Sequence, residues 1–347
     1  MSLSHQLYDG LFADAQMAAL WDTGAQTAHM LQVIAALCTA QGQAGRVDPA
    51  LAARAAAHVA GFVSDMADLS AGSGRDGLPV PTLIRQLKAG AGPAAAAIHA
   101  GATSQDVLDT VLALTLRATS DLIDARLADL SLRLHALADR FGGNPLMART
   151  RMQAALPVAV ADRIRQWQAP LADHRDRLRH LRPQTERLSL AGPTGTTDFG
   201  ETAPLMAQAL GLHAGPVWHT DRSGVVGFAG WLALVAGSLG KMGQDIALMA
   251  QQGVDEVTLS GGGGSSVMAH KHNPVLAELL VTLARFNAGQ AGVMAQAMVH
   301  EQERSGAAWM LEWLVLPQMA QATGRALTAA LTLTDGIAGM GHPEGYK

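Results

Sequence analysis

The chain of 347 residues has little of what several protein classes require. Its one cysteine, Cys38, excludes an internal disulfide and fits a reducing compartment. Aromatic residues make up only 4%, which disfavours a β-sandwich. A net charge of −4 does not suggest nucleic acid or an anionic membrane as a partner. Apolar runs of membrane-spanning length and a signal-peptide pattern are also missing from the sequence. We therefore expect a soluble, cytoplasmic protein.

Sequence motifs for metal, redox and nucleotide chemistry are also missing. The chain contains no HExxH, CxxC or GxxxxGK[ST] pattern. His270 and His272 flank Lys271, and a cation between two histidines argues against a metal site there. Metal, redox and P-loop mechanisms therefore lack support in the sequence.

The residues that are present favour helices. Hydrophobic residues make up 49%, and many are alanine and leucine. Helical periodicity runs over 105–141, 154–188 and 221–252, and a further helix is expected to begin at Pro274. The first of these stretches corresponds to about 55 Å of helix. Rods of this length pack as a bundle, and apolar residues on more than one face predict an oligomer.

The part before residue 95 has shorter predicted helices than the rest of the chain. Shorter helices are expected over 25–40, 49–69 and 79–88, separated by loops rich in glycine and proline. We therefore predict an all-α protein with a small helical domain, 1–95, and a long-helix bundle domain, 96–347. Few residues follow Leu331, so no full C-terminal domain is expected.

The stretch from Gly261 to Pro274, GGGGSSVMAHKHNP, concentrates polar and flexible residues. Four consecutive glycines allow the backbone to bend sharply or to approach a ligand. Asn273 suits a helix N-cap and Pro274 the first helical position, so the helix N-terminus would face the loop. Together with the charge of Lys271, this pattern predicts a site for an anion.

The stretch His99–Asp106, HAGATSQD, precedes the first long helix. Thr103 or Ser104 is well placed to cap that helix, with Asp106 in its first turn. A plain cap explains these residues, and so does a second anion site in which hydroxyls and helix N–H groups hold a carboxylate.

The stretch Arg149–Pro157, RTRMQAALP, is expected to lead into the second long helix, with Pro157 in its first turn. Thr150, Arg151 and Gln153 would then be hydrogen-bond donors ahead of a helix. Surface arginines on an ordinary loop are the alternative explanation.

Two further segments precede the third long helix. Residues 191–196, AGPTGT, form a tight turn that is best explained as a connection. WHTDR, residues 218–222, provides His219 and Arg222. His219 is a conceivable proton donor, although a packed or surface histidine is more common.

These stretches together carry a resemblance. GSSVMAHKHNP resembles the signature of the fumarase/aspartase superfamily, and HAGATSQDVLDT and RTRMQAALP resemble its other two hallmark regions in the same order. The resemblance covers about residues 95–330. Within the superfamily, the WHTDR segment and ERSGAAWMLEWLVLPQ are most similar to the carboxymuconate cycloisomerase branch. The resemblance implies a cofactor-free homotetramer whose active sites are each assembled from three subunits.

The resemblance also implies roles for individual residues. It identifies Ser265 as the proton-transfer residue, with His219 and Arg151 as further catalytic candidates. The substrate-binding candidates are His99, Thr103, Ser104, Thr150, Gln153, Arg222, Lys271 and Asn273. The substrate would be a tricarboxylate diene that closes to a lactone in protocatechuate breakdown by the β-ketoadipate pathway.

The chain departs from the superfamily pattern at three places. Arg151 stands where the hydrolytic lyases usually have histidine, a departure that the cycloisomerase branch shares. Ala269 stands where proline is expected, and the usual C-terminal helical domain is missing. Two alternatives therefore stay open: another lyase of the superfamily, such as an adenylosuccinate lyase, or a helical scaffold without catalytic activity.

Overall fold

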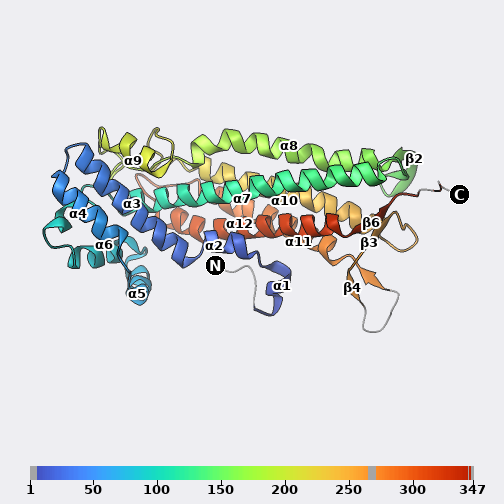
Figure 1. The fold of residues 1–347 in the computed structure, drawn as a ribbon, viewed down its shortest axis with the longest axis horizontal. Helices are drawn as coiled ribbons and strands as arrows, with labels where there is room; N and C mark the ends of the chain where they lie inside the picture. The colour runs from blue at the N-terminus through green and yellow to red at the C-terminus, as the bar shows by residue number, and fades with distance from the viewer. Residues whose placement is uncertain (1–5, 265–270, 343, 345–347) are drawn as a thin grey trace.

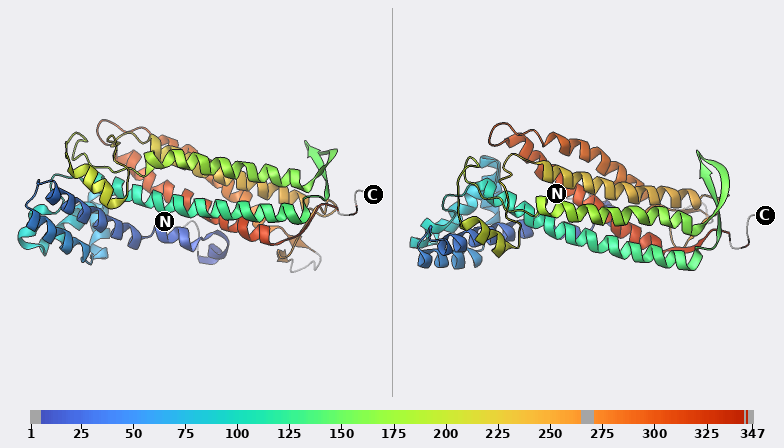
Figure 2. Two further views of the ribbon diagram at one scale, coloured as in Figure 1. Left: turned by 45° about the horizontal axis from the view of Figure 1, so that its top comes forward. Right: turned by 90° about the horizontal axis from the view of Figure 1, so that it is seen from above.

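The computed structural model describes residues 6–264, 271–342 and 344. Long helices lie side by side in an elongated bundle, and short helices cover one end of it (Figure 1). The long helices are α7 (Ser104–Phe141), α8 (Val160–Thr185), α10 (Ser223–Met249), α11 (Val275–Gln296) and α12 (Gly306–Asp335). Figure 2 shows the same arrangement from two other sides. The prediction of an all-α long-helix bundle is confirmed.

The short helices at that end come mostly from the first hundred residues. They are α3 (Thr23–Gln43), α4 (Pro49–Ala60), α5 (Met66–Asp76), α6 (Val80–Ala89) and η2 (Gly92–Ala97). The first helices, η1 (Gln6–Tyr8), α1 (Asp9–Phe12) and α2 (Ala15–Leu20), lie instead along the side of the bundle, where α2 contacts α7 and α12 (Figure 1). The helix predicted over 49–69 is wrong, because the chain breaks after Ala60 and Asp65 caps a new helix. The glycine-rich stretch 71–77 lies largely inside α5. A Cβ on Gly72 would lie 2.1 Å from Thr82 Oγ1, so close packing explains this helical glycine.

Two hydrophobic cores divide the chain. The larger core runs along the bundle. The second lies under the short helices and combines residues between Met30 and Leu114 with residues between Leu188 and Leu212. The second group includes α9 (Thr202–Leu210), which packs against α3. The sequence boundary near residue 95 does not anticipate this returning segment.

Short strands cover the opposite end of the bundle, and the sequence does not predict them. β1 (Pro145–Thr150) and β2 (Gln153–Ala159) form an antiparallel hairpin between α7 and α8. β3 (Val257–Leu259) pairs with β6 (Ile337–Met340), and β4 (Gly263–Gly264) pairs with β5 (His272–Asn273). In Figure 1 these strands lie at the right, away from α9 and the short helices.

Two predicted helix starts are wrong. Pro157 lies in β2, opposite Met147, and helix α8 begins only at Val160. Pro274 is the N-cap of α11 rather than its first residue, and Asn273 belongs to β5. Proline is compatible with an edge strand as well as with a helix start, so the residue type alone does not decide between them.

Helix α10 is apolar because it packs inside the bundle. Among the described residues, it is the one helix long and apolar enough to cross a membrane, but half of its most apolar window is buried. Gly240 and Gly243 bring it close to α11. A Cβ on Gly240 would lie 2.4 Å from Ala284 Cβ, and a Cβ on Gly243 would lie 2.6 Å from the Ala277 carbonyl oxygen. A buried core helix accounts for these observations.

Candidate active site

The start of α7 is held by hydrogen bonds on both sides. Thr103 is the N-cap, as predicted, and its N–H donates to Asp106 Oδ2 over 2.9 Å. Asp106 is buried and also accepts from the N–H groups of Ala191 (2.8 Å) and Gly192 (3.0 Å). Burial nevertheless raises the pKa of this carboxyl. Asp106 therefore fastens the turn 191–196 to the first turn of α7.

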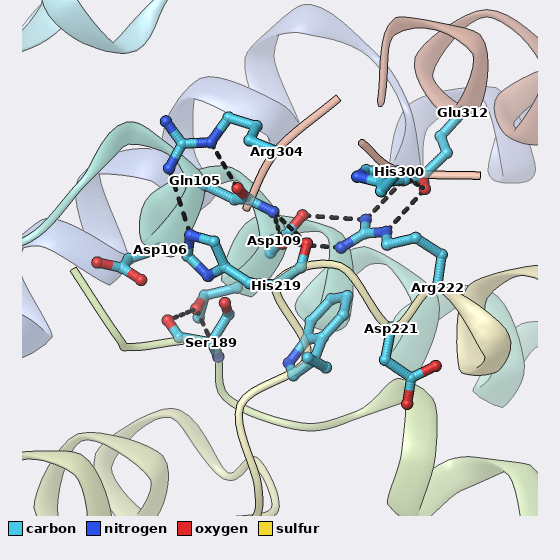
Figure 3. Close-up of polar contacts among 12 residues, drawn as sticks. Gln105, Asp106, Asp109, Ser189, His219, Asp221, Arg222, His300, Arg304 and Glu312 are labelled. Atoms are coloured by element: carbon cyan, nitrogen blue, oxygen red, sulfur yellow. Dashed lines mark hydrogen bonds and ion pairs between the residues drawn. The ribbon is translucent and has the colours of Figure 1, made fainter. Parts of the chain in front are cut away.

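Gln105, the next buried side chain, joins three parts of the chain (Figure 3). Its Nε2 donates to Asp109 Oδ2 over 3.0 Å and to the His219 backbone oxygen over 2.7 Å. Its Oε1 accepts from Arg304 Nε over 2.7 Å. Gln105 thus connects α7, the segment before α10 and the loop between α11 and α12.

His219 lies between this cluster and a hollow of about 390 Å³. The hollow is lined by Thr194, Gly195, Val217, His219, Thr220, Asp221, Gln302 and Glu303. The ring is 5% exposed, and its Nε2 lies 3.3 Å from Arg304 Nη2. Arginine can only donate, so His219 Nε2 accepts and the proton of the neutral ring is on Nδ1. Burial is the main cause that lowers the pKa of His219, and Arg304 and Arg222 lower it further. Nδ1 is buried and has no partner among the described residues.

Arg222 belongs to a fully buried ion cluster. Its guanidinium bonds to both oxygens of Asp109, at 2.9 and 3.1 Å, and to both oxygens of Glu312, at 2.7 and 2.6 Å. All three side chains are at most 1% exposed. Burial raises the pKa of Glu312, although Arg222 acts against the rise. This geometry gives Arg222 a structural role. The substrate-binding role expected from the sequence would require an accessible guanidinium, and in this cluster the guanidinium is buried.

Arg304 has a different setting, and the sequence reasoning assigned it no role. Its guanidinium contacts neutral acceptors: Gln105 Oε1, His219 Nε2, Thr103 Oγ1 at 3.3 Å and the Pro193 carbonyl oxygen at 3.1 Å. No carboxylate among the described residues forms an ion pair with it. Its charge is therefore available to an anion, and the residue is exposed.

His99 and Ser104 also lie at this end of the bundle. His99 has a φ of 58°, and its Nε2 is buried without a partner among the described residues. Burial lowers the pKa of this imidazole. Ser104 is the first residue of α7 and is half-buried. His99, Thr103, Ser104 and His219 thus lie at the same end of the bundle, and their part in a site stays a prediction.

The remaining candidates lie at the other end. Thr150, Arg151 and Gln153 are exposed at the tip of the β1–β2 hairpin, and their side chains form no hydrogen bonds with the described residues. Lys271 is exposed and Asn273 half-buried beside β4. Ser265 and Ala269 lie outside the described residues.

The length of α7 separates these two groups. Its 38 residues correspond to about 57 Å of helix. One end carries the His219 cluster, and the hairpin follows the other end directly (Figure 1). One copy of the chain therefore does not bring the predicted residues into a single site.

Backbone strain marks the same segments. Among the described residues, five non-glycine residues have a positive φ. His99, Arg151, Met152 and Gln302 are four of them, and each lies in one of the loops that carry the candidate residues. Such conformations cost free energy and often occur at functional sites. The described residues contain no group of three metal-ligating side chains.

Comparisons with known proteins show the family of the chain. A family model described as a lyase matches residues 82–288. The chain is 37% identical to a 3-carboxy-cis,cis-muconate cycloisomerase of Pseudomonas aeruginosa, over 96% of this chain and 76% of that protein. A nitrosuccinate lyase of Streptomyces davaonensis is 31% identical, over 94% and 73%.

Solved structures show the same fold. The 3-carboxy-cis,cis-muconate lactonizing enzyme of Pseudomonas putida superposes with a TM-score of 0.90 at 35% identity, covering 96% of this chain and 77% of that one. A fumarate lyase of Mesorhizobium sp. BNC1 superposes with a TM-score of 0.89 at 30% identity, covering the same shares. The family expected from the three motifs is thus confirmed, and the chain belongs to the lyases of the fumarase/aspartase superfamily.

Proposed function

We propose that the chain catalyses the cycloisomerisation of 3-carboxy-cis,cis-muconate to a carboxymuconolactone. The observation that carries this proposal is its similarity, over nearly its whole length, to proteins named for that reaction. The reaction would place it in protocatechuate catabolism through the β-ketoadipate pathway.

The reaction explains why cationic and polar groups are needed. An oxygen of one substrate carboxylate bonds to a carbon of a double bond, and the π electrons move to the carbon beside another carboxylate. That carbon then takes a proton from the site. The protein must hold three negative charges, stabilise the developing enolate-like carboxylate and move one proton.

The His219 end supplies groups for holding carboxylates. Arg304 offers a charge that no carboxylate among the described residues neutralises, and the Thr103 hydroxyl lies beside it. His219 is a neutral ring in this setting, and its proton is on Nδ1, which is buried without a partner among the described residues. This refines the expectation that His219 acts as an acid, because burial lowers the pKa of the ring and so disfavours its protonated form.

The other end would supply the proton-transfer machinery. We carry over Ser265 as the proton-transfer residue, with Lys271 and Asn273 as carboxylate partners, and Thr150, Arg151 and Gln153 as further contacts. A serine hydroxyl needs stabilisation of its alkoxide to act in this way, and Lys271 would provide it.

The two ends would meet between copies of the chain. A separation of about 57 Å within one copy supports a homotetramer in which each site takes residues from different subunits. Exposed apolar residues support this assembly: Met152 and Leu156 on the hairpin, and Leu234 and Leu314 on the bundle, are 44–74% exposed. Cytoplasmic localisation remains part of this proposal.

A paired assay tests the function. Purified protein is given 3-carboxy-cis,cis-muconate, and loss of the diene absorbance is followed; adenylosuccinate is tested in parallel for release of fumarate. Turnover of the first substrate alone is expected. Fumarate release alone would instead favour an adenylosuccinate-type lyase, and no turnover of either by a folded tetramer would favour a helical scaffold.

A further inference from the structure

Gln105 is a fully hydrogen-bonded side chain at the His219 end, and the sequence reasoning assigned it no role. It is 0% exposed and uses both N–H groups and its oxygen. Its amide orientation is fixed by its neighbours, because a flipped amide would place NH₂ against the Arg304 guanidinium and oxygen against Asp109 and the His219 carbonyl.

We infer that Gln105 is a positioning residue of the proposed site: with Arg304, it holds His219 as the neutral ring whose proton is on Nδ1. Gln105 Nε2 donates to the His219 backbone oxygen, and Gln105 Oε1 accepts from Arg304 Nε. Arg304 in turn donates to His219 Nε2. The two contacts together set the position and the tautomer of the imidazole. The inference rests on the proposed function only for the identity of the substrate at His219.

The neutral carboxamide suits this position for an electrostatic reason. The charged groups facing His219 are Asp109 from α7, Arg222 at the start of α10, and Arg304 from the loop after α11. Asp221 and Glu303 line the adjacent hollow. A carboxylate at 105 would neutralise Arg304, repel Asp109 and favour the charged imidazole. A glutamine bonds to the same partners without these effects.

Two variants separate charge from geometry. Gln105→Glu keeps the shape and adds a negative charge, and Gln105→Met keeps the volume and removes the hydrogen bonds. Asn287→Leu is the matched control, because Asn287 is also 0% exposed and bonds to Met319 and Thr323, within the bundle.

The direct measurement is the titration of the His219 ring between pH 5 and 8. Histidine labelled at its ring atoms is followed by NMR, and the His219 signal is assigned by its loss in His219→Gln. We expect the midpoint to rise by about one pH unit in Gln105→Glu, since an added charge nearby favours imidazolium. Asn287→Leu should leave the midpoint unchanged.

The kinetic measurement uses 3-carboxy-cis,cis-muconate. Gln105→Met should lower kcat about 10- to 100-fold with KM changed less than about threefold, the scale of a misplaced reacting group. Asn287→Leu should keep kcat within about twofold even if both variants lose similar stability.

The two measurements distinguish failure of the positioning role from failure of the proposed function. An unchanged His219 midpoint in Gln105→Glu, or a kcat in Gln105→Met no lower than in Asn287→Leu, overturns the positioning role. If the unaltered protein does not convert the substrate but the midpoint still moves as expected, the proposed function fails and the role of Gln105 in holding His219 stands.

Discussion

The two ends of α7 carry candidate residues in opposite settings. At the N-terminal end, Gln105, His219 and Arg304 are bonded to one another and to the backbone of a neighbouring turn. At the other end, Thr150 and Arg151 project into solvent from a hairpin. One end is organised within the subunit, whereas the other lacks partners of its own. Under the proposed function, assembly of subunits rather than folding of one chain would complete the site.

The largest effect should come from Ser265, the proposed proton-transfer residue. Ser265→Ala is expected to lower kcat by at least about a hundredfold, the usual scale for a positioned proton-transfer group. Circular dichroism and size-exclusion chromatography verify that the variant is folded and assembled. Near-full turnover would remove Ser265 from the mechanism.

A mixing experiment tests whether the two ends belong to different subunits. The double variant His219→Ala/Arg304→Ala and the variant Ser265→Ala should each be nearly inactive. The two variants are unfolded together in equal amounts and refolded. About a quarter of normal activity should return, because each group of residues is intact in half of the subunits and a site needs both groups intact, from different subunits. If each site lay within one chain, the mixture would stay as inactive as its components.

Stability should also distinguish the ends. Glu312→Ala leaves Arg222 buried with one carboxylate partner fewer, and such losses cost about 3–5 kcal/mol. Arg151→Ala removes an exposed side chain and should change the free energy of unfolding by less than about 0.5 kcal/mol. Urea denaturation measures both. An equal loss of stability in the two variants would contradict the contrast between the buried residues near the start of α7 and the exposed hairpin at its other end.

A smaller, pH-dependent effect is expected midway along the bundle. Burial lowers the pKa of His174 from 6.5 to about 4, and the ring bonds to Ser238 over 2.8 Å. The unfolded chain binds this proton first, so the stability that the neutral ring provides is complete above about pH 6.5 and is lost as the pH falls towards 4. His174→Gln should flatten this decline in urea titrations, whereas the same change at the exposed His213 should leave it in place.

The long helices were predictable because their signal is local and repeated. Helix α7 begins at Ser104, within one residue of the predicted start, and ends at Phe141 as predicted. The hairpin was missed because Pro157 is compatible with both a strand and a helix start. The helical glycines of α5 were missed because Gly72 is selected by a contact with Thr82, on another helix.

The site was predictable to a similar degree. Thr103 and His219 lie in segments with a helix-start pattern, so the sequence identifies them. Arg304 and Gln105 meet across 199 positions, and nothing next to either residue indicates the other. An arginine at a helix start resembles a ligand contact, and the sequence does not reveal that Asp109 and Glu312 pair with Arg222 in the interior.

The returning segment Leu188–Leu212 has a consequence for synthesis on the ribosome. The small core at the end of the bundle needs this segment, but most of its other members precede Leu114. While the intervening residues are being added, the nascent N-terminal helices expose an apolar surface that nothing yet covers. Such intermediates tend to aggregate, so this end of the bundle is where chaperones would be needed during translation.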